Sequence, residues 1–348
     1  MDIYILKCSL ALLISFAVSL YAIPPLITIA LEKKLFDIPN PYKVHVDPIP
    51  RLGGLAIFVG FMVSLFLLGN LGQGIQQIIA GCVIIFFIGL KDDLIPISAL
   101  KKFLGQLLAA GIVMFMGNIR ITSFQGFLGI YELDSLNPGL SYILTFVTII
   151  GITNAINLID GIDGLAGTLI FLFSVTFGLV FLFHNKPYLS IVAFSLTGSV
   201  LAFLRFNIVN AKIFMGDTGS LLCGFLLSVL AIEFIELKHL GTNPMVAVSV
   251  LCLPLIDTIR VFSLRIYYGL SPFLPNRDHV YHRLLDAGFT HFFTTFLLSF
   301  FNLFVIAGAF YLSEQGNLTL LLFLIISHVI LYLLVLLLRF KKLKELKI

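Results

Sequence analysis

The sequence predicts an all-α, polytopic membrane protein with about eleven transmembrane helices in a single integral-membrane domain spanning residues 1–348. Hydrophobic residues make up 59% of the 348 residues and charged residues only 11%, whereas about 25% of a soluble domain is charged. Apolar runs close to the length that crosses a bilayer, roughly 17 to 25 residues, recur along the whole chain. The runs are 3–31, 52–69, 75–90, 103–117, 140–159, 165–183, 189–204, 221–235, 245–266, 292–312 and 318–338.

Individual runs differ in what they indicate. The first is too long for a signal peptide and has no cleavage-site pattern, so we expect it to be retained as a span. The runs at 103–117, 189–204 and 221–235 are short, which leaves the count uncertain by one. Residues 118–139 form the longest outer loop, where we expect a small hairpin through 120–122 and 130–131. The four cysteines lie in apolar segments without ligand spacing and are expected to be buried.

The distribution of positive charge predicts the topology. If the N-terminus lies outside, eighteen of the 22 Lys and Arg residues fall on the inner side, and only Lys7, Arg120, Lys186 and Lys238 fall outside. This bias predicts an outside N-terminus and a cytoplasmic C-terminus, with the basic 339–347 segment anchored at the membrane surface. Ten of the twelve aspartates also fall on the inner side. Topology does not require that arrangement, whereas chemistry at this face would.

Adjacent carboxylates end the third run at Asp92 and Asp93. Two neighbouring carboxylates stay ionised only beside a cation or in ample water. Mg²⁺ typically takes one or two carboxylates together with substrate phosphates. Lys102 and Gln106, one helical turn apart on the next run, are candidates to face the same site as phosphate donors. The alternative is a solvated charge pair that ends a helix.

Polar residues recur every third position in the stretch from Asn154 through Asn157 and Asp160 to Asp163, with glycines at 161 and 164. This spacing drifts around a helix, so we expect one helix to end near Ile159 and Asp163 to cap the next one. A cap and a turn are the simpler reading. Two amides and two acids at membrane depth exceed what capping needs, which favours a functional site.

Glycines flank an acid in the segment 214–220, which opens the eighth run at Asp217. A helix N-terminus presents free N–H groups to phosphate, and glycine lets the backbone approach a ligand closely. Asp217 would then hold a cation that bridges to the phosphate, although it could simply be an N-cap.

A long loop follows the ninth run, which carries Asp257 and Arg260 at the spacing of a helical ion pair. The histidines and arginines of the loop suit a diphosphate clamp, since arginine binds phosphate through two donors. A zinc site is less well supported, because no cysteine or third nearby histidine completes a ligand set. The four loop residues are Arg277, His279, His282 and Arg283.

These segments, together with residues 43–54, which include His45 and Arg51, resemble the polyprenyl-phosphate N-acetylhexosamine-1-phosphate transferase family. The resemblance covers nearly the whole chain, with four motifs in order. The 48–54 stretch and the Ser271-Pro272 loop are similar to the GlcNAc-type branch, not to the phospho-MurNAc-pentapeptide branch with its three consecutive histidines. The chain departs from the GlcNAc-type pattern at Asn276, where aspartate is usual, and at Tyr281, where histidine is usual.

The resemblance implies transfer of a sugar 1-phosphate, most simply GlcNAc 1-phosphate, from a UDP-N-acetylhexosamine to undecaprenyl phosphate or a similar polyprenyl phosphate. UMP is released, Mg²⁺ (or Mn²⁺) is required, and the product is the first lipid-linked intermediate of a cell-envelope polysaccharide. The active site would face the cytoplasm in the cell membrane, among membrane lipids and without nucleic acid. A homodimer is compatible with this reading.

The resemblance also assigns residues. Asp217 is the metal ligand, with Asp93 in support, and Asp92 is the base acting on the lipid phosphate. Phe214 stacks on uracil in a pocket shared with Asp163 and Asn207. The catalytic set is Asp92, Asp93, Asp160 and Asp217; the substrate-binding set is His45, Arg51, Lys102, Asn154, Asn157, Asp163, Asn207, Phe214, Arg277, His279, His282 and Arg283.

Two alternatives stay open from the residues alone. One is a two-step route in which a carboxylate, Asp217 or Asp160, is the nucleophile. A secondary transporter also uses broken helices and buried acids, but it predicts acids near the bilayer midplane and inverted repeats. The acids here lie at span ends, and no repeat is visible.

Overall fold

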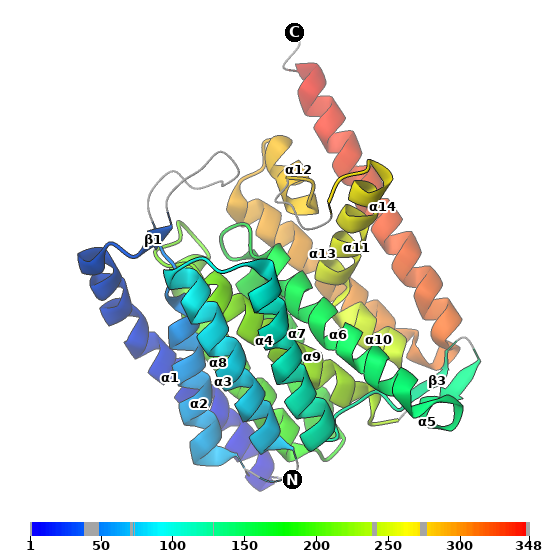
Figure 1. The fold of residues 1–348 in the computed structure, drawn as a ribbon. Helices are drawn as coiled ribbons and strands as arrows, with labels where there is room; N and C mark the ends of the chain where they lie inside the picture. Colours follow the sequence, from blue (N-terminus) through cyan, green and yellow to red (C-terminus); the bar gives the residue numbers. More distant parts are fainter. Residues whose placement is uncertain are drawn as a thin grey trace.

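The computed structural model describes residues 2–37, 49–69, 72, 74–127, 129–238, 242–271 and 277–345. Within these residues the chain is a bundle of helices with two small antiparallel strand pairs, so the all-α membrane fold is confirmed. The two chain ends lie at opposite ends of the bundle (Figure 1). The strand pairs are β1 (Phe36–Asp37) with β2 (Ile49–Pro50), and β3 (Ser123–Phe127) with β4 (Ile130–Glu132).

Every apolar run of the sequence is helical. Nine helices among the described residues are long and apolar enough to cross a membrane, a bent pair makes a tenth candidate, and α2 (Gly53–Leu68) is a shorter apolar helix. The runs that looked short extend to full span length. The nine are α1 (Asp2–Lys33), α3 (Ile75–Leu94), α4 (Ala99–Gly111) with the π-helix η1 (Ile112–Met116), α6 (Pro138–Ile159), α7 (Leu165–Phe183), α8 (Pro187–Asn207), α9 (Gly216–Ile235), α13 (His291–Tyr311) and α14 (Asn317–Glu345).

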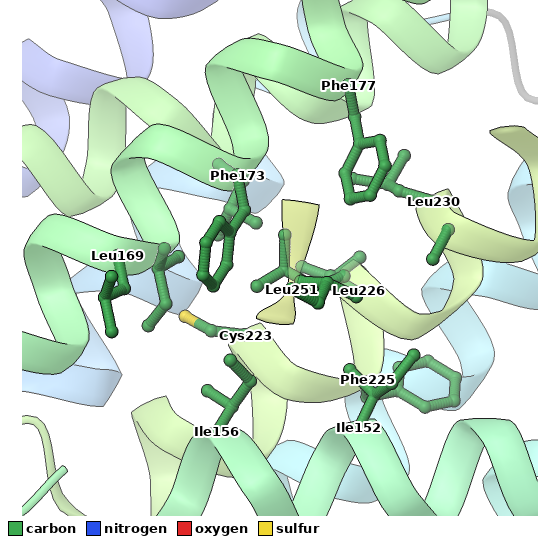
Figure 2. Close-up of a cluster of buried hydrophobic side chains, with 14 of the residues drawn as sticks. Ile152, Ile156, Leu169, Phe173, Phe177, Cys223, Phe225, Leu226, Leu230 and Leu251 are labelled. Carbon is green, nitrogen blue, oxygen red and sulfur yellow. The ribbon is translucent and has the colours of Figure 1, made fainter. Parts of the chain in front are cut away.

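Helix α9 is the centre of the bundle. Its side chains are almost all buried, and Figure 2 shows Phe225 and Cys223 of α9 among side chains of α6 and α7, including Ile156 and Phe173. Small residues let neighbouring helices approach the N-terminal end of α9. A Cβ atom on Gly89 of α3 would lie 2.5 Å from the Cα of Thr218. This close crossing brings the end of α3 onto the first turn of α9.

The bent pair consists of α10 (Pro244–Val250) and α11 (Cys252–Tyr267), which meet at 86°. Pro254 explains the break, because proline lacks an N–H and its ring clashes with the carbonyl four residues earlier. Asn302 of α13 satisfies the freed backbone: its Nδ2 donates to the Val250 carbonyl at 3.0 Å, and its Oδ1 accepts from the Leu253 N–H at 3.2 Å. The bend directs α11 toward the short helix α12 (Val280–Asp286). Helix α12 lies at the end of the bundle where α14 ends (Figure 1).

The expected hairpin between α4 and α6 exists, but its first strand begins later than expected. Residues 120–122 do not form its first strand, because their backbone is engaged elsewhere: Ile121 N–H donates to Thr145 and Thr122 N–H donates to Glu236. The short helix α5 (Leu133–Leu136) follows the second strand. The four cysteines are buried and free, as expected.

Candidate active site

Asp93 of α3 caps the first turn of α9. Its Oδ1 accepts the Asp217 N–H at 2.8 Å, and its Oδ2 accepts the Thr218 N–H at 2.9 Å and the Thr218 hydroxyl at 2.5 Å. The residue preceding α9, Met215, makes no side-chain cap, so a carboxylate from another helix satisfies the free N–H groups. Gly216 has a φ of +70°, and a Cβ atom there would lie 2.5 Å from Asp93 Oδ2. Asp217 is therefore not the N-cap; it is the residue that Asp93 holds in place.

Lys102 lies between two carboxylates. Its Nζ is 2.7 Å from Asp92 Oδ2 and is also hydrogen-bonded to Asp217 Oδ2. Asn157 of α6 donates to Asp217 Oδ1 at 3.2 Å and to the Ser220 hydroxyl at 2.8 Å. Carboxylates from α3 and α9 thus converge on one cation at the junction of α3, α4, α6 and α9. The expectation that Lys102 faces the acids is confirmed.

The same two carboxylates are the candidates for a divalent cation. Among the described residues, no three His, Cys, Asp or Glu side chains converge as a complete ligand set. Mg²⁺ bound together with substrate phosphates needs only one or two carboxylates, and Asp92 and Asp217 already meet around a positive charge. Asp93 fits this role less well, because three donors from α9 occupy its oxygens.

The turn between α6 and α7 holds two acids with different surroundings. Helix α6 ends at Ile159 as expected, but Asp163 does not cap α7: the N-cap is Gly164, which has a φ of +76°. Asp163 Oδ2 instead accepts the Ala211 N–H at 3.2 Å, and its Oδ1 is 3.5 Å from His291 Nδ1. The prediction of an Asp163 cap was wrong, because αL geometry at the start of α7 suits glycine.

Asp160 lies in the same turn, outside the spanning helices. Burial raises its pKa to about 7, and the nearby charges of Asp217 and Asp93 add to the rise while Arg51 opposes it. A carboxyl of this kind exchanges a proton near neutrality. Arg51, a predicted substrate-binding residue, is thus near the acids.

Asn207 and Asn154 make structural contacts. The buried Asn207 accepts the Gly164 N–H at 2.8 Å and donates to the Ile213 carbonyl at 2.9 Å, so both ends of its amide are used within the chain. Asn154 pairs with Gln106 of α4 through two amide contacts. Asn207 therefore holds two backbone segments near the site together, and Asn154 joins α6 to α4.

Phe214 is held beside the strand β2. Its N–H donates to the Pro50 carbonyl at 2.7 Å, and its carbonyl accepts the Gly53 N–H at 2.9 Å. The side chain is only partly buried, so its ring retains surface for contact. His45 lies outside the described residues.

The basic loop folds into a short helix that the sequence did not predict. His279 is the N-cap residue of α12, and His282 lies inside it. Tyr281 ties α12 to the acidic turn: its hydroxyl is 3.4 Å from the Leu158 carbonyl, and a Cβ atom on Gly161 would lie 2.1 Å from that hydroxyl. The loop and the acids therefore lie together at one end of the bundle.

The four predicted binding residues of the loop differ in their surroundings. His279 Nδ1 contacts Asp257 Oδ2 at 2.7 Å. Burial lowers the pKa of His282 to about 4, with Arg277 and His279 contributing, so this imidazole is neutral near pH 7. Exposed Arg277 lies 3.9 Å from Asp286. Arg283 is partly buried, and among the described residues its Nε has no hydrogen-bond partner.

Several contributors to the site were not anticipated. Thr218 and Ser220, which contact Asp93 and Asn157, and His291, which lies near Asp163, are not among the predicted site residues. Asp257 does pair with Arg260 as expected, at 2.8 Å, but it also contacts His279. The buried position of Asp257 within an apolar run was the available signal.

Comparison with known proteins gives a consistent result. Residues 75–235 match the family model described as glycosyl transferase family 4. The chain is 33% identical over 73% of its length to a decaprenyl-phosphate N-acetylglucosaminephosphotransferase of Mycobacterium leprae, covering 70% of that protein. It is 31% identical to an undecaprenyl-phosphate alpha-N-acetylglucosaminyl 1-phosphate transferase of Salmonella typhi, with 75% and 72% of the two chains covered.

A third relative is a probable undecaprenyl-phosphate N-acetylglucosaminyl 1-phosphate transferase of Bacillus subtilis, 31% identical, with 84% of this chain and 81% of the relative covered. Identity at this level over most of both chains shows common descent. The chain belongs to glycosyl transferase family 4, the family of polyprenyl-phosphate N-acetylhexosamine-1-phosphate transferases.

Proposed function

We propose that the protein transfers GlcNAc 1-phosphate from UDP-GlcNAc to a polyprenyl phosphate such as undecaprenyl phosphate, and releases UMP. The observation that carries the proposal is the convergence of Asp92 and Asp217 on Lys102 at the N-terminal end of α9. Such a cluster suits a reaction between two phosphorylated substrates, because phosphoryl transfer depends chiefly on positioning and charge neutralisation. The family and the names of the relatives favour GlcNAc as the sugar.

In the proposed reaction, a phosphate oxygen of the lipid attacks the sugar-linked phosphorus of UDP-GlcNAc. The bond from that phosphorus to the bridging oxygen breaks, and the bridging oxygen leaves with UMP. Lys102 binds phosphate oxygens, and Asp92, which also accepts the Ile97 N–H at 2.8 Å, receives any proton left on the lipid phosphate. Asp160, with its pKa near 7, is the second group able to accept a proton there.

Mg²⁺, or Mn²⁺ in its place, would be held by Asp217 and Asp92 and would neutralise charge on the diphosphate. In this proposal Asp93 acts by fixing the first turn of α9, and so the position of Asp217. Asn157 orients the other oxygen of Asp217.

The UDP-sugar would lie between the acidic cluster and α12. Phe214 offers a partly exposed ring for uracil, since a base stacks on an aromatic side chain. His279 and Arg283 lie on or at the start of α12, whose Tyr281 touches the acidic turn. These residues are placed to bind the diphosphate, with neutral His282 as a single hydrogen-bond donor.

We place the active site on the cytoplasmic side of the cell membrane, with the N-terminus outside. Support comes from the lysine and arginine bias. The C-terminal helix, rich in lysine, also ends on the same side of the bundle as α12 (Figure 1). Cytosolic UDP-sugars would then reach the site directly.

The test is UMP release by the purified protein from a panel of UDP-sugars with undecaprenyl phosphate. UDP-GlcNAc should support turnover, and UDP-MurNAc-pentapeptide should not. Asp217→Asn is the inactive control, and its melting temperature should show that it remains folded. No UMP from any UDP-sugar, with lipid and Mg²⁺ present, would contradict the proposal.

A further inference from the structure

A buried carboxylate connects α12 to two other helices. Asp257 of α11 is 0% exposed, yet it is surrounded by hydrogen-bond donors. It accepts from the Arg260 guanidinium at 2.8 Å, the Tyr332 hydroxyl of α14 at 2.9 Å and the Val280 N–H at 3.2 Å. His279 Nδ1 is 2.7 Å away. Four groups, from α11, α14 and the start of α12, thus meet at one side chain.

We propose that Asp257 and Tyr332 are positioning residues for His279, holding its ring so that Nε2 addresses the diphosphate of the sugar nucleotide. The inference rests on the proposed function, and it names two residues, one of them on the last helix, that act on substrate only through His279.

The hydrogen-bonding partners of Asp257 decide which nitrogen of His279 carries a proton. A carboxylate that accepts from an arginine and a tyrosine is ionised and can only accept hydrogen bonds. The proton between Asp257 and His279 is therefore on Nδ1. A histidine whose Nδ1–H is fixed by a carboxylate has its ring orientation fixed. The ionised Asp257 also balances the charge of a doubly protonated ring, and in that form Nε2–H is the donor that faces the diphosphate. Among the described residues, His279 Nε2 has no hydrogen-bond partner.

Helix α12 needs such anchoring because it has only seven residues, and so short a helix is not stable alone. Arg260 adds a second contact: its Nη2 donates to the Asp278 carbonyl at 2.5 Å. The guanidinium also lies 4.7 Å from the centre of the Tyr332 ring. Tyr332 thus orients both the carboxylate and its arginine partner.

Helix α12 lies next to the acidic turn of the candidate active site. The rings of His279 and Tyr281 are parallel, 5.5 Å apart, and the Tyr281 hydroxyl reaches the turn that holds Asp160. Substitution of Tyr332 should therefore weaken the use of UDP-GlcNAc, because it acts through Asp257 and His279 on the diphosphate site.

The first experiment compares Tyr332→Phe with Tyr311→Phe. Tyr332→Phe keeps the ring beneath Arg260 and removes only the hydroxyl. Tyr311→Phe makes the same change at an exposed position (83% exposed), the last residue of α13. Tyr332→Phe should lower kcat/KM for UDP-GlcNAc roughly three- to tenfold, the effect of one hydrogen bond. The KM for polyprenyl phosphate should not change, and Tyr311→Phe should match the wild type.

The kinetic pattern separates positioning from loss of folded protein. A purely structural role would lower kcat by reducing the amount of active enzyme and would leave both KM values unchanged. That result, or an equal rise in both KM values, would overturn the proposal.

The second experiment is a double-mutant cycle of Asp257→Asn and His279→Ala, measured as kcat/KM for UDP-GlcNAc. If Asp257 acts through His279, its substitution should have little further effect once His279 is alanine. Additive effects would refute the inference while leaving the transferase activity of the wild type intact. Absence of turnover in the wild type itself would instead refute the proposed function. If Asp257→Asn does not fold, Tyr332→Phe replaces it in the cycle.

Discussion

Asp93 and Thr218 join two helices at the heart of the acidic cluster. The Asp93 carboxylate accepts both the N–H and the hydroxyl of Thr218, which is 125 positions away in sequence. The contact fixes the start of α9 against the end of α3, and so sets the distance between Asp217 and Asp92. A carboxylate that seemed a metal ligand from sequence has the contacts of a helix cap.

Substitution of Asp93 should destabilise the protein as well as inactivate it. Asp93→Ala leaves buried N–H groups of α9 unpaired, which should lower the free energy of unfolding by about 1–3 kcal/mol and reduce turnover at least tenfold. Thr218→Val, which removes one donor of three, should have a smaller effect. The measurements are melting temperature in detergent and UMP release. An Asp93→Ala protein with unchanged melting temperature but lost Mg²⁺ binding would make Asp93 a ligand instead of a cap.

Lys102 should govern how strongly the cluster depends on a metal. Lys102→Met leaves Asp92 and Asp217 facing each other without a counter-charge. Turnover should fall on the order of a hundredfold, and added Mg²⁺ should raise the melting temperature of the variant more than that of the wild type. Lys101→Met, at the exposed neighbouring position, is the control. Equal Mg²⁺ responses in all three proteins would show that the two acids do not form a cation site.

The neutral state of His282 should make stability depend on pH. The folded protein holds its pKa at about 4 and the unfolded chain near 6.5, so between these values only the unfolded state binds the proton. Stability is thus complete above about pH 6.5 and is lost as pH falls toward 4, by at most about 2 kcal/mol allowing for solvent near the ring. His282→Gln should flatten the melting temperature over this range. An unaltered slope would show that folding does not lower the pKa of His282.

Labelling of introduced cysteines with a thiol reagent should show which side of the membrane each end of the bundle faces. The four native cysteines are buried, so an impermeant reagent should label only an introduced cysteine. Ser98→Cys, at the exposed start of α4 beside the acids, should be labelled only after cells are permeabilised. Gln315→Cys, exposed between α13 and α14, should be labelled in intact cells. The opposite pattern would invert the topology.

The spans were predictable because each is a continuous apolar stretch, and a bilayer accepts few other structures. The break between α10 and α11 was harder to predict. Pro254 marks it in the sequence, but Asn302, which hydrogen-bonds the backbone groups freed at the break, lies 48 residues further along the chain. The second hairpin strand contains residues 130–131 as predicted. The first strand begins later because Thr122 is hydrogen-bonded to Glu236, which is 114 positions away in sequence.

At the site, residue types identified the chemistry but not the division of roles. Nothing local to Asp92 and Asp93 tells which carboxylate meets Lys102 and which caps α9; their neighbours come from other helices. Similarly, Asn207 looked like a ligand for uridine, whereas the fold uses both ends of its amide to hold the 164 and 213 backbones together. Tertiary contacts decide such roles.

Transfer of phosphate together with sugar is the central claim, and a doubly labelled donor tests it most directly. UDP-GlcNAc carrying ³²P in the sugar-linked phosphate and ¹⁴C in the sugar would be incubated with the protein, Mg²⁺ and undecaprenyl phosphate, and the lipid would then be extracted. Both labels should enter the lipid in equal amounts, with none in wild-type reactions lacking acceptor or in Asp217→Asn. Lipid that contains ¹⁴C without ³²P, or neither label, would contradict the account.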